Sequence, residues 1–271
     1  MTPPPQDLRL PFDRPRPSRP SFRGGAVSTQ IDAQRLERWR GIGAQAGATM
    51  FMTVMAGFSV LLHRQTGQTD IAVGSPVAAK PHPELEGLIG FFVDTQVVRN
   101  HLAGNPSFLD LVRSAKASVL EEQEDRDIPF QLRLNALPAR RGPAAVPLFR
   151  VWLNHMRALP PAVADGPLKF TALPGLHLVA KYDLMLTLIE DRASMRVELA
   201  YKSDLFDRSS AQSMLGELLG IMDSAAADTS QTLSVLADAA TENAVRAARA
   251  AQAHLAAGDR DRLRALVGRA G

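Results

Sequence analysis

The stretch from Leu88 to Arg99 constrains the fold of this chain more than any other. Gly90 breaks the segment before it, and β-branched and aromatic residues dominate from Phe91 to Val98. This composition is typical of a buried β-strand. We therefore expect a strand here, at the centre of a sheet.

Asp94 and Thr95 interrupt this apolar run with polar side chains. Burying an unpaired carboxylate costs several kcal/mol, so we expect the Asp94 carboxylate to be capped, ion-paired or directed toward a solvated channel. A bond to a neighbouring amide or to Arg99 is about as consistent with the sequence as a role in a functional site. Both interpretations stay open at this point.

The apolar periodicity elsewhere predicts an α/β fold, in which helices flank a mixed sheet. A nearly all-apolar helix is expected from Met50 to His63, with Thr49 as its N-cap, and it should pack on the central strand. Two alternating stretches joined by a short polar turn predict a β-hairpin. The expected elements are strands at 26–31, 71–77 and 148–154, helices at 32–46, 50–63, 108–124 and 207–222, and hairpin strands at 181–190 and 195–201.

Composition divides the chain into three regions. Residues 1–25 are rich in Pro and Arg, which predicts an extended linker because proline blocks both helices and central strands. The globular part is expected at 26–236. Residues 237–271 are rich in Ala and Arg with few apolar anchors, which predicts a helical tail that packs weakly or against a partner. Within the globular part, Met156 to Leu176 is expected to be a long mobile connection.

With 45% hydrophobic and 22% charged residues, the composition is that of a globular protein. No apolar run approaches the roughly 18 residues of a membrane span, so no membrane is expected. The absence of cysteine excludes disulfides, thiolate metal sites and a cysteine nucleophile. No secretory leader is visible, which favours a cytoplasmic location. The 31 basic and 28 acidic residues are spread along the chain, so we expect no nucleic-acid partner.

An ordered series of motifs resembles the condensation domains of nonribosomal peptide synthetases. The stretch Ile-Gly-Phe-Phe-Val-Asp-Thr is similar to a core motif of that family, which usually has Asn at the position of Asp94. The resemblance begins at Leu10 and extends to about Leu236. The other matching motifs are Asp127-Ile128-Pro129-Phe130-Gln131, Pro147-Leu148-Phe149, Tyr182-Asp183-Leu184-Met185-Leu186 and Asp204-Leu205-Phe206. Their order makes the resemblance far more specific than a single motif would.

The family's catalytic motif, two adjacent histidines followed by Asp-Gly, belongs to the first half of the domain. No two histidines are adjacent in this sequence. The resemblance therefore implies the second, C-terminal half, with a chloramphenicol-acetyltransferase-like fold, and Met1 is expected to lie at the boundary between the halves. Among the histidines only His155, beside Asn154, is considered as a functional group, and a structural role is favoured for it. We expect no catalytic residue and no metal site.

The resemblance also implies a function. Condensation domains form an amide bond between a carrier-bound thioester and an amine, in a tunnel that substrates on phosphopantetheine arms enter from opposite sides. No cofactor is expected to bind the chain directly, because the phosphopantetheine belongs to peptidyl carrier proteins. The residues expected to line the tunnel are Ser75, Gly90, Asp94, Thr95, Pro129, Phe130 and Asp183.

Several partners and roles follow from the missing motif. The N-terminal half is expected on a separate polypeptide, or else the uncovered apolar face between the halves should cause self-association. Acyltransferase activity is then expected only when a catalytic N-terminal half complements the chain. The alternatives are an autonomous enzyme, a noncatalytic carrier-protein interaction module or truncated remnant, and half of an epimerization domain.

Overall fold

The computed structural model describes residues 5–19, 21–78, 84, 87–124, 130–135, 148–158, 162–165, 168–171 and 179–238. Its helices and strands are interspersed along the chain, as expected for an α/β fold. In chain order they are β1 (Gly24–Ile31), α1 (Ala33–Ala46), α2 (Met50–Thr66), β2 (Asp70–Ala78), β3 (Val93–His101), α3 (Phe108–Glu124), α4 (Phe130–Asn135), β4 (Val151–Arg157), β5 (Ala162–Asp165), β6 (Leu168–Thr171), β7 (Leu184–Glu190), β8 (Met195–Lys202) and α5 (Arg208–Ala227).

A six-stranded sheet with the strand order β1-β8-β7-β4-β2-β3 forms the centre of the fold. β4 pairs in parallel with both β2 and β7, whereas β1 with β8, β7 with β8, and β2 with β3 are antiparallel pairs. The sheet is therefore mixed, as predicted. The hairpin predicted from the two alternating stretches is confirmed as β7 and β8, with Glu190 opposite Met195 at its closed end.

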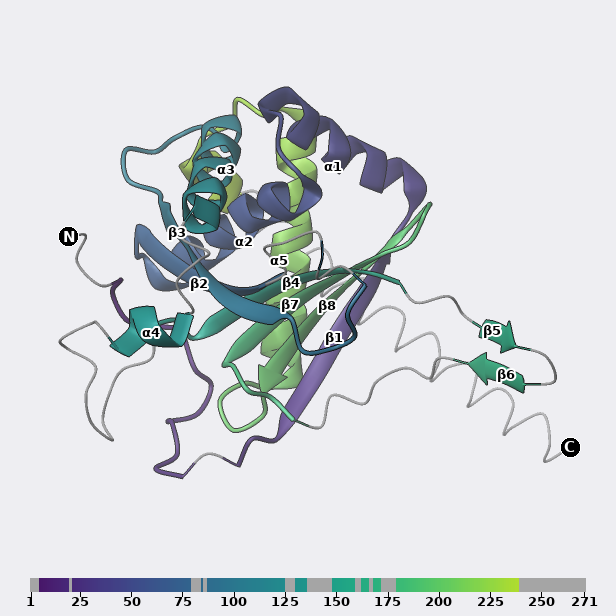
Figure 1. Ribbon diagram of the computed structural model, residues 1–271. Coiled ribbons are helices and arrows are strands. Elements are labelled where there is room, and N and C mark those ends of the chain that lie inside the picture. The colour runs from purple at the N-terminus through teal and green to yellow at the C-terminus, as the bar shows by residue number, and fades with distance from the viewer. Residues whose placement is uncertain are drawn as a thin grey trace, which may run out of the picture.

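Helices α1, α2, α3 and α5 pack together against the sheet (Figure 1), with α3 on β3 and α5 on β1 and β8. α2 is the central helix of this layer, because it contacts α1, α3 and α5 and reaches β2. All its residues from Met52 to Leu62 are buried, which explains why its sequence is apolar on every side. The predicted cap is present, since the Thr49 hydroxyl accepts a hydrogen bond from the Met52 amide at 3.3 Å.

The prediction of a central, buried strand at 91–98 is wrong in two respects. β3 begins at Val93, and it lies at one edge of the described sheet rather than in the middle. Phe91 is 90% exposed, and the side chains buried in β3 are the alternate ones, Gln96, Val98 and Asn100. The side chains of an edge strand are buried only on the face that helices cover. The apolar run therefore predicted more buried side chains than the strand has. For the same reason α2 packs on its neighbouring helices and β2, and not mainly on β3.

The predicted long connection at 156–176 contains secondary structure. β5 and β6 pair antiparallel as a separate two-stranded sheet. The alternation of Leu168, Lys169, Phe170 and Thr171 is typical of a strand, but the many prolines around it outweighed this local pattern.

Residues 5–23, here called the N-terminal strap, contain no helix where they are described, as the prolines predicted. The strap nevertheless packs on the core, because Leu8 and Leu10 are only 5% exposed. Residues 239–271 lie outside the described part of the chain, which includes most of the predicted tail. The division of the chain at residues 25 and 236 stays a prediction.

Among the described helices, none is alone both long and apolar enough to cross a membrane. The bent pair α1 and α2 passes the same test only when the two are taken together. Within the described residues, no three His, Asp or Glu side chains gather as they would around a metal ion.

Candidate functional site

Asp94 bridges two elements that are far apart in sequence. Its Oδ1 accepts a hydrogen bond from the Thr95 amide at 2.7 Å, and its Oδ2 accepts one from the Phe130 amide at 3.1 Å. Phe130 is the first residue of α4. Of the two interpretations left open by the sequence, the structure shows the carboxylate bound to amides, and it brings together the predicted site residues Asp94, Thr95 and Phe130.

Arg99 pairs with Asp70 rather than with Asp94. Its Nε and Nη2 each lie 2.7 Å from a different Asp70 oxygen, so the pair is bidentate. The two residues lie on neighbouring antiparallel strands, β3 and β2. The hydrogen bonds from Arg99 hold the pKa of the Asp70 carboxyl below its ordinary value, although partial burial opposes this.

Ser75 lies on the face of the sheet that the helices cover. It is 1% exposed and stands directly opposite Gln96 in β3, and both side chains point to the same side as buried Val73 and Val98. Among the described residues, the Ser75 hydroxyl makes only a long contact of 3.4 Å, with the Pro76 carbonyl. Within the described part of the chain, the buried Gln96 Oε1 finds no hydrogen-bond partner. The structure therefore separates Ser75 from Thr95, whose side chain points to the opposite face.

Four aromatic rings gather on that opposite face. Phe130, Phe149, Trp152 and Tyr182 are here called the aromatic cluster. The Phe149 centroid lies 6.3 Å from that of Phe130, 5.8 Å from that of Trp152 and 5.7 Å from that of Tyr182, and Trp152 stacks on Tyr182 at 4.7 Å. Burial raises the pKa of the Tyr182 hydroxyl above its ordinary value.

Sequence reasoning missed this cluster. In the sequence, Phe130, Phe149 and Tyr182 are marked only as members of three separate motifs. Membership of a motif does not indicate which residues are in contact. The cluster also depends on Gly74 in β2, because a Cβ there would lie 2.4 Å from the Phe149 ring and 2.7 Å from the Trp152 ring.

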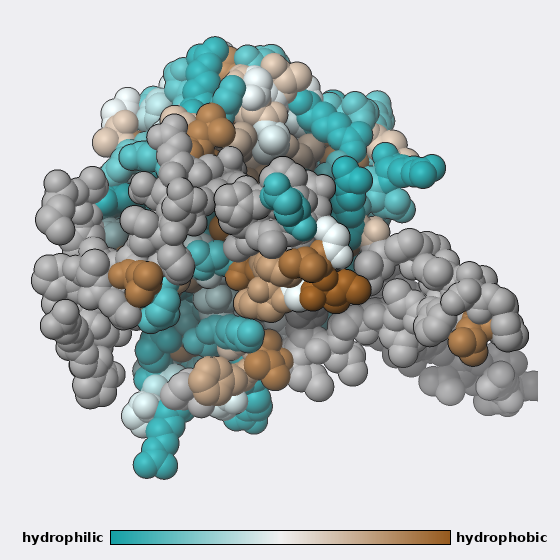
Figure 2. Space-filling model, in the orientation of Figure 1, coloured by the Kyte–Doolittle hydropathy of each residue, from teal (hydrophilic) through white to brown (hydrophobic). Residues whose placement is uncertain are grey.

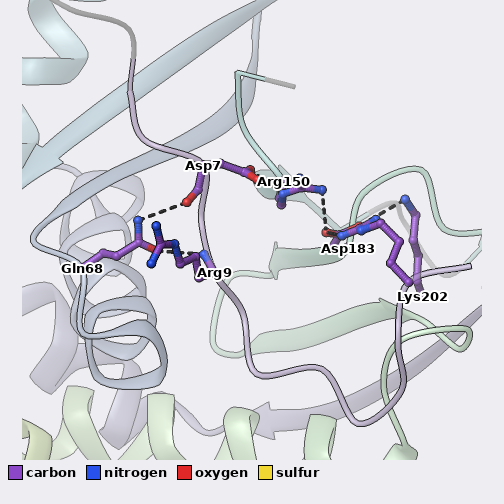
Figure 3. Close-up of polar contacts among 7 residues, drawn as sticks. Asp7, Arg9, Gln68, Arg150, Asp183 and Lys202 are labelled. Atoms are coloured by element: carbon purple, nitrogen blue, oxygen red, sulfur yellow. Dashed lines mark hydrogen bonds and ion pairs between the residues drawn. The ribbon is translucent and has the colours of Figure 1, made fainter. Parts of the chain in front are cut away.

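Asp183 is a structural ion-pair centre. Its side chain is 3% exposed, and three cations surround it: Arg16 of the strap, Arg150 before β4, and Lys202 at the end of β8. The Lys202 Nζ lies 3.2 Å from Oδ1 and the Arg150 Nη1 lies 3.7 Å from Oδ2. Figure 3 shows that these contacts join the strap to the ends of two strands. Asp183 thus holds the strap to the sheet, and its predicted place in the tunnel lining stays a prediction.

The same network holds the start of the strap (Figure 3). Arg150 also pairs with Asp7, at 2.7 Å between Nη2 and Oδ2, and Gln68 donates to the Asp7 carbonyl while accepting from the Arg9 amide. The hydrogen bonds that Arg150 donates to the Asp7 carboxylate raise the pKa of its guanidinium above the ordinary value. The cation is therefore fixed between two carboxylates.

Gly90 lies in an exposed apolar stretch that leads into β3. Residues 88–93 are here called the apolar segment. Leu88 is 53%, Ile89 104%, Phe91 90% and Val93 48% exposed. Figure 2 shows apolar residues gathered in the middle of this face of the molecule. Monomeric globular proteins rarely expose so many large apolar side chains in one segment without a partner. Pro129, the remaining predicted site residue, lies outside the described residues.

His155 has a structural setting. Its Nε2 lies 2.8 Å from the Glu190 Oε2, and Glu190 is also bound by Arg40 of α1. Burial opposes ionisation of Glu190, but the hydrogen bonds from Arg40 and His155 lower the pKa of its carboxyl below the ordinary value. This histidine is thus held by the Glu190 carboxylate, which Arg40 also binds, at the junction of β4, β7 and α1.

The sequence matches the condensation domain family over residues 4–244. The chain belongs to this family. Among its relatives, phosphinothricin tripeptide synthetase PhsB of Streptomyces viridochromogenes is 38% identical over 221 residues, covering 80% of this chain and 19% of the synthetase. Bacitracin synthase 3 of Bacillus licheniformis is 34% identical over 227 residues, covering 84% of this chain and 4% of the synthase. The condensation chain thus spans less than a fifth of the length of these relatives.

Solved structures of related domains have the same fold as this chain. The X-domain from teicoplanin biosynthesis is 30% identical with a TM-score of 0.73, and the match covers 84% of this chain and 53% of that domain. A four-domain nonribosomal peptide synthetase bound to AMP and glycine gives a TM-score of 0.77 at 19% identity, covering 85% of this chain and 19% of that one, which shows the fold alone. The α/β fold of the chloramphenicol-acetyltransferase type, expected from the motifs, is confirmed.

Proposed function

We propose that this chain supplies the C-terminal half of a nonribosomal peptide synthetase condensation domain. The observation that carries the proposal is coverage: the match takes in 84% of this chain but only 53% of the X-domain, and 51% of that domain in its complex with OxyB. The absence of adjacent histidines from the sequence supports the same conclusion. The half would line the substrate tunnel and dock peptidyl carrier proteins, with the cytoplasm as the proposed location.

The chemistry requires both halves. The amine nitrogen attacks the thioester carbonyl carbon, the C–N bond forms, the C–S bond breaks, and the thiol leaves with the proton that the nitrogen loses. Holding two tethered substrates in position lowers the barrier, and a positioned proton acceptor contributes typically about a hundredfold or more. In this proposal the histidine motif of the N-terminal half supplies that acceptor, since His155 is bound to Glu190. This chain would supply part of the tunnel wall and the surfaces that bind the peptidyl carrier proteins.

The apolar segment is the proposed contact with the N-terminal half. Ile89 and Phe91 are almost fully exposed, and such side chains gain free energy when a partner covers them. A rigid aromatic side chain such as Phe91 also loses little conformational entropy on binding. Self-association through the same segment is the expected behaviour of the chain without that half.

A noncatalytic interaction module is the second candidate. One observation favours it: the X-domain of teicoplanin biosynthesis, 29% identical in this second structure, was solved in a complex with OxyB. By this alternative the chain would bind a carrier protein or another protein without any turnover. Half of an epimerization domain is a third candidate, because the motifs alone do not separate it from a condensation half.

A turnover assay with donor and acceptor carrier proteins tests the proposal. We expect no amide product from the chain alone, and product when an N-terminal condensation half with the two adjacent histidines is added. Carrier binding without product under either condition would favour the interaction module. Substantial product from the chain alone that His155→Ala abolishes would overturn the proposal and indicate an autonomous acyltransferase.

A further inference from the structure

Asp94 uses both carboxylate oxygens, and they serve different parts of the fold. Oδ1 accepts from the amide of the next residue, Thr95, at 2.7 Å. Oδ2 accepts at 3.1 Å from the amide of Phe130, the first residue of α4, which lies 36 residues further along the chain. A carboxylate at the start of a helix is favoured because the first amides lack partners within the helix. Asp94 therefore fixes the place where α4 begins.

Phe130 connects this bond to the aromatic cluster. Its ring contacts Phe149, and Phe149 in turn contacts both Trp152 and Tyr182. Phe130 is thus the outer ring of the cluster, and the only described hydrogen bond at its backbone amide goes to Asp94. A shift of α4 would remove Phe130 from Phe149 and admit water beside Trp152.

We propose that Asp94 is a positioning residue, which orders the aromatic cluster through Phe130 and does not itself contact a substrate. Its effect on turnover rests on the proposed function, but its effect on the cluster does not. An asparagine offers one carbonyl oxygen where aspartate offers two, so it can keep only one of the two amide bonds. Asp94→Asn should therefore retain part of the order that Asp94→Ala loses.

Trp152 reports on the cluster directly. The chain has two tryptophans, and the other, Trp39, is buried in the core at 1% exposure. In a Trp39→Phe background, acrylamide quenching of fluorescence then measures the access of solvent to Trp152 alone. We expect stronger quenching in Asp94→Ala and in Phe130→Ala, and an intermediate value in Asp94→Asn.

A double-mutant cycle separates positioning from general loosening. If Asp94 acts through Phe130, the variant carrying both alanines should be quenched no more than Phe130→Ala alone. Asp191→Ala is the matched control, because Asp191 Oδ1 also accepts from the next amide at 2.7 Å but begins no helix. We expect this control to leave quenching unchanged.

Hydrogen exchange provides a second measurement that needs no tryptophan substitution. With Trp39 retained, Asp94→Ala should speed exchange of the amides at 130–135, and Asp191→Ala should not. Additive quenching by the two alanines, or unchanged quenching and exchange in Asp94→Ala, would overturn the proposal. Neither result depends on turnover, so the proposed function stands or fails separately.

Discussion

Gly74 shows how one residue supports the candidate site. A methyl group there would overlap the rings of Phe149 and Trp152. We expect Gly74→Ala to lower the free energy of unfolding by about 1 to 3 kcal/mol, as overpacking does. Gly41→Ala is the control, since no atom lies within 4 Å of a Cβ there, and it should stabilise α1 by roughly 0.5 to 1 kcal/mol. Urea unfolding of both variants checks this, and equal effects would contradict it.

The pair of Asp70 and Arg99 predicts a pH dependence. The pKa of Asp70 is lowered in the folded chain, so the pair stabilises the fold fully above the unfolded value of about 3.9 and loses this contribution as pH falls through the lower folded pKa. Asp70→Asn should therefore melt below the unsubstituted chain at pH 7, and the two should converge in acid. A melting difference that persists unchanged at the lowest pH would argue against this role.

At the same scale, the sequence predicted that the Asp94 carboxylate would have a partner, but not which one. The cost of burying a carboxylate indicated that it must be satisfied, yet Phe130 is too distant in the chain for any local pattern to identify. Asp183 is a similar case, because its partners Arg16 and Arg150 come from the strap and from the approach to β4. Motif resemblance marked both residues, and only the tertiary structure gave their contacts.

Among the elements, the N-terminal strap carries a prediction about α5. Asp207, the N-cap residue of α5, makes no capping bond with its own side chain, and Asp13 of the strap instead binds two residues at the start of this helix. Asp13 accepts from the Asp207 amide at 2.7 Å and from the Ser210 hydroxyl at 2.8 Å. Asp13→Ala should cost about 1 kcal/mol of stability, as loss of hydrogen bonds does.

Chemical denaturation checks the Asp13 prediction, with Asp13→Asn as the variant that keeps one acceptor. Asp13→Asn should fall between Asp13→Ala and the unsubstituted chain. If Asp13→Ala unfolds at the same denaturant concentration as the unsubstituted chain, the strap does not stabilise the start of α5 in solution.

Elements with a strong period were predictable, and elements defined by their neighbours were not. Helix α2 and the β7–β8 hairpin follow from apolar runs, Thr49 as a cap and a short polar turn. The edge position of β3 does not follow, because a run of apolar residues looks the same in a buried central strand and in an edge strand that an exposed segment precedes. The exposure of Phe91 is the physical sign of that difference.

For the molecule as a whole, the proposed function depends on a tunnel that this chain forms only in part. The described fold has its own core, from α2 to the strands β4, β7 and β8, so it is stable in principle without a partner. The exposure of its apolar segment and its coverage of only about half of a related domain are what the proposed function predicts for a surface that binds a second polypeptide. The proposed function therefore requires that this chain bind an N-terminal condensation half. A binding measurement tests the proposal more directly than a turnover assay does.

That binding is measured as the affinity of this chain for an N-terminal condensation half, by analytical ultracentrifugation and titration calorimetry. We predict a one-to-one complex that Phe91→Glu weakens about tenfold or more, since burying a phenylalanine is worth about 1.5 to 3 kcal/mol. Leu120→Glu is the control, because Leu120 is an exposed apolar residue on α3, at 44% exposure, outside the apolar segment. Absence of a complex, or equal weakening by Phe91→Glu and Leu120→Glu, would show that the apolar segment is not the surface that joins the two halves.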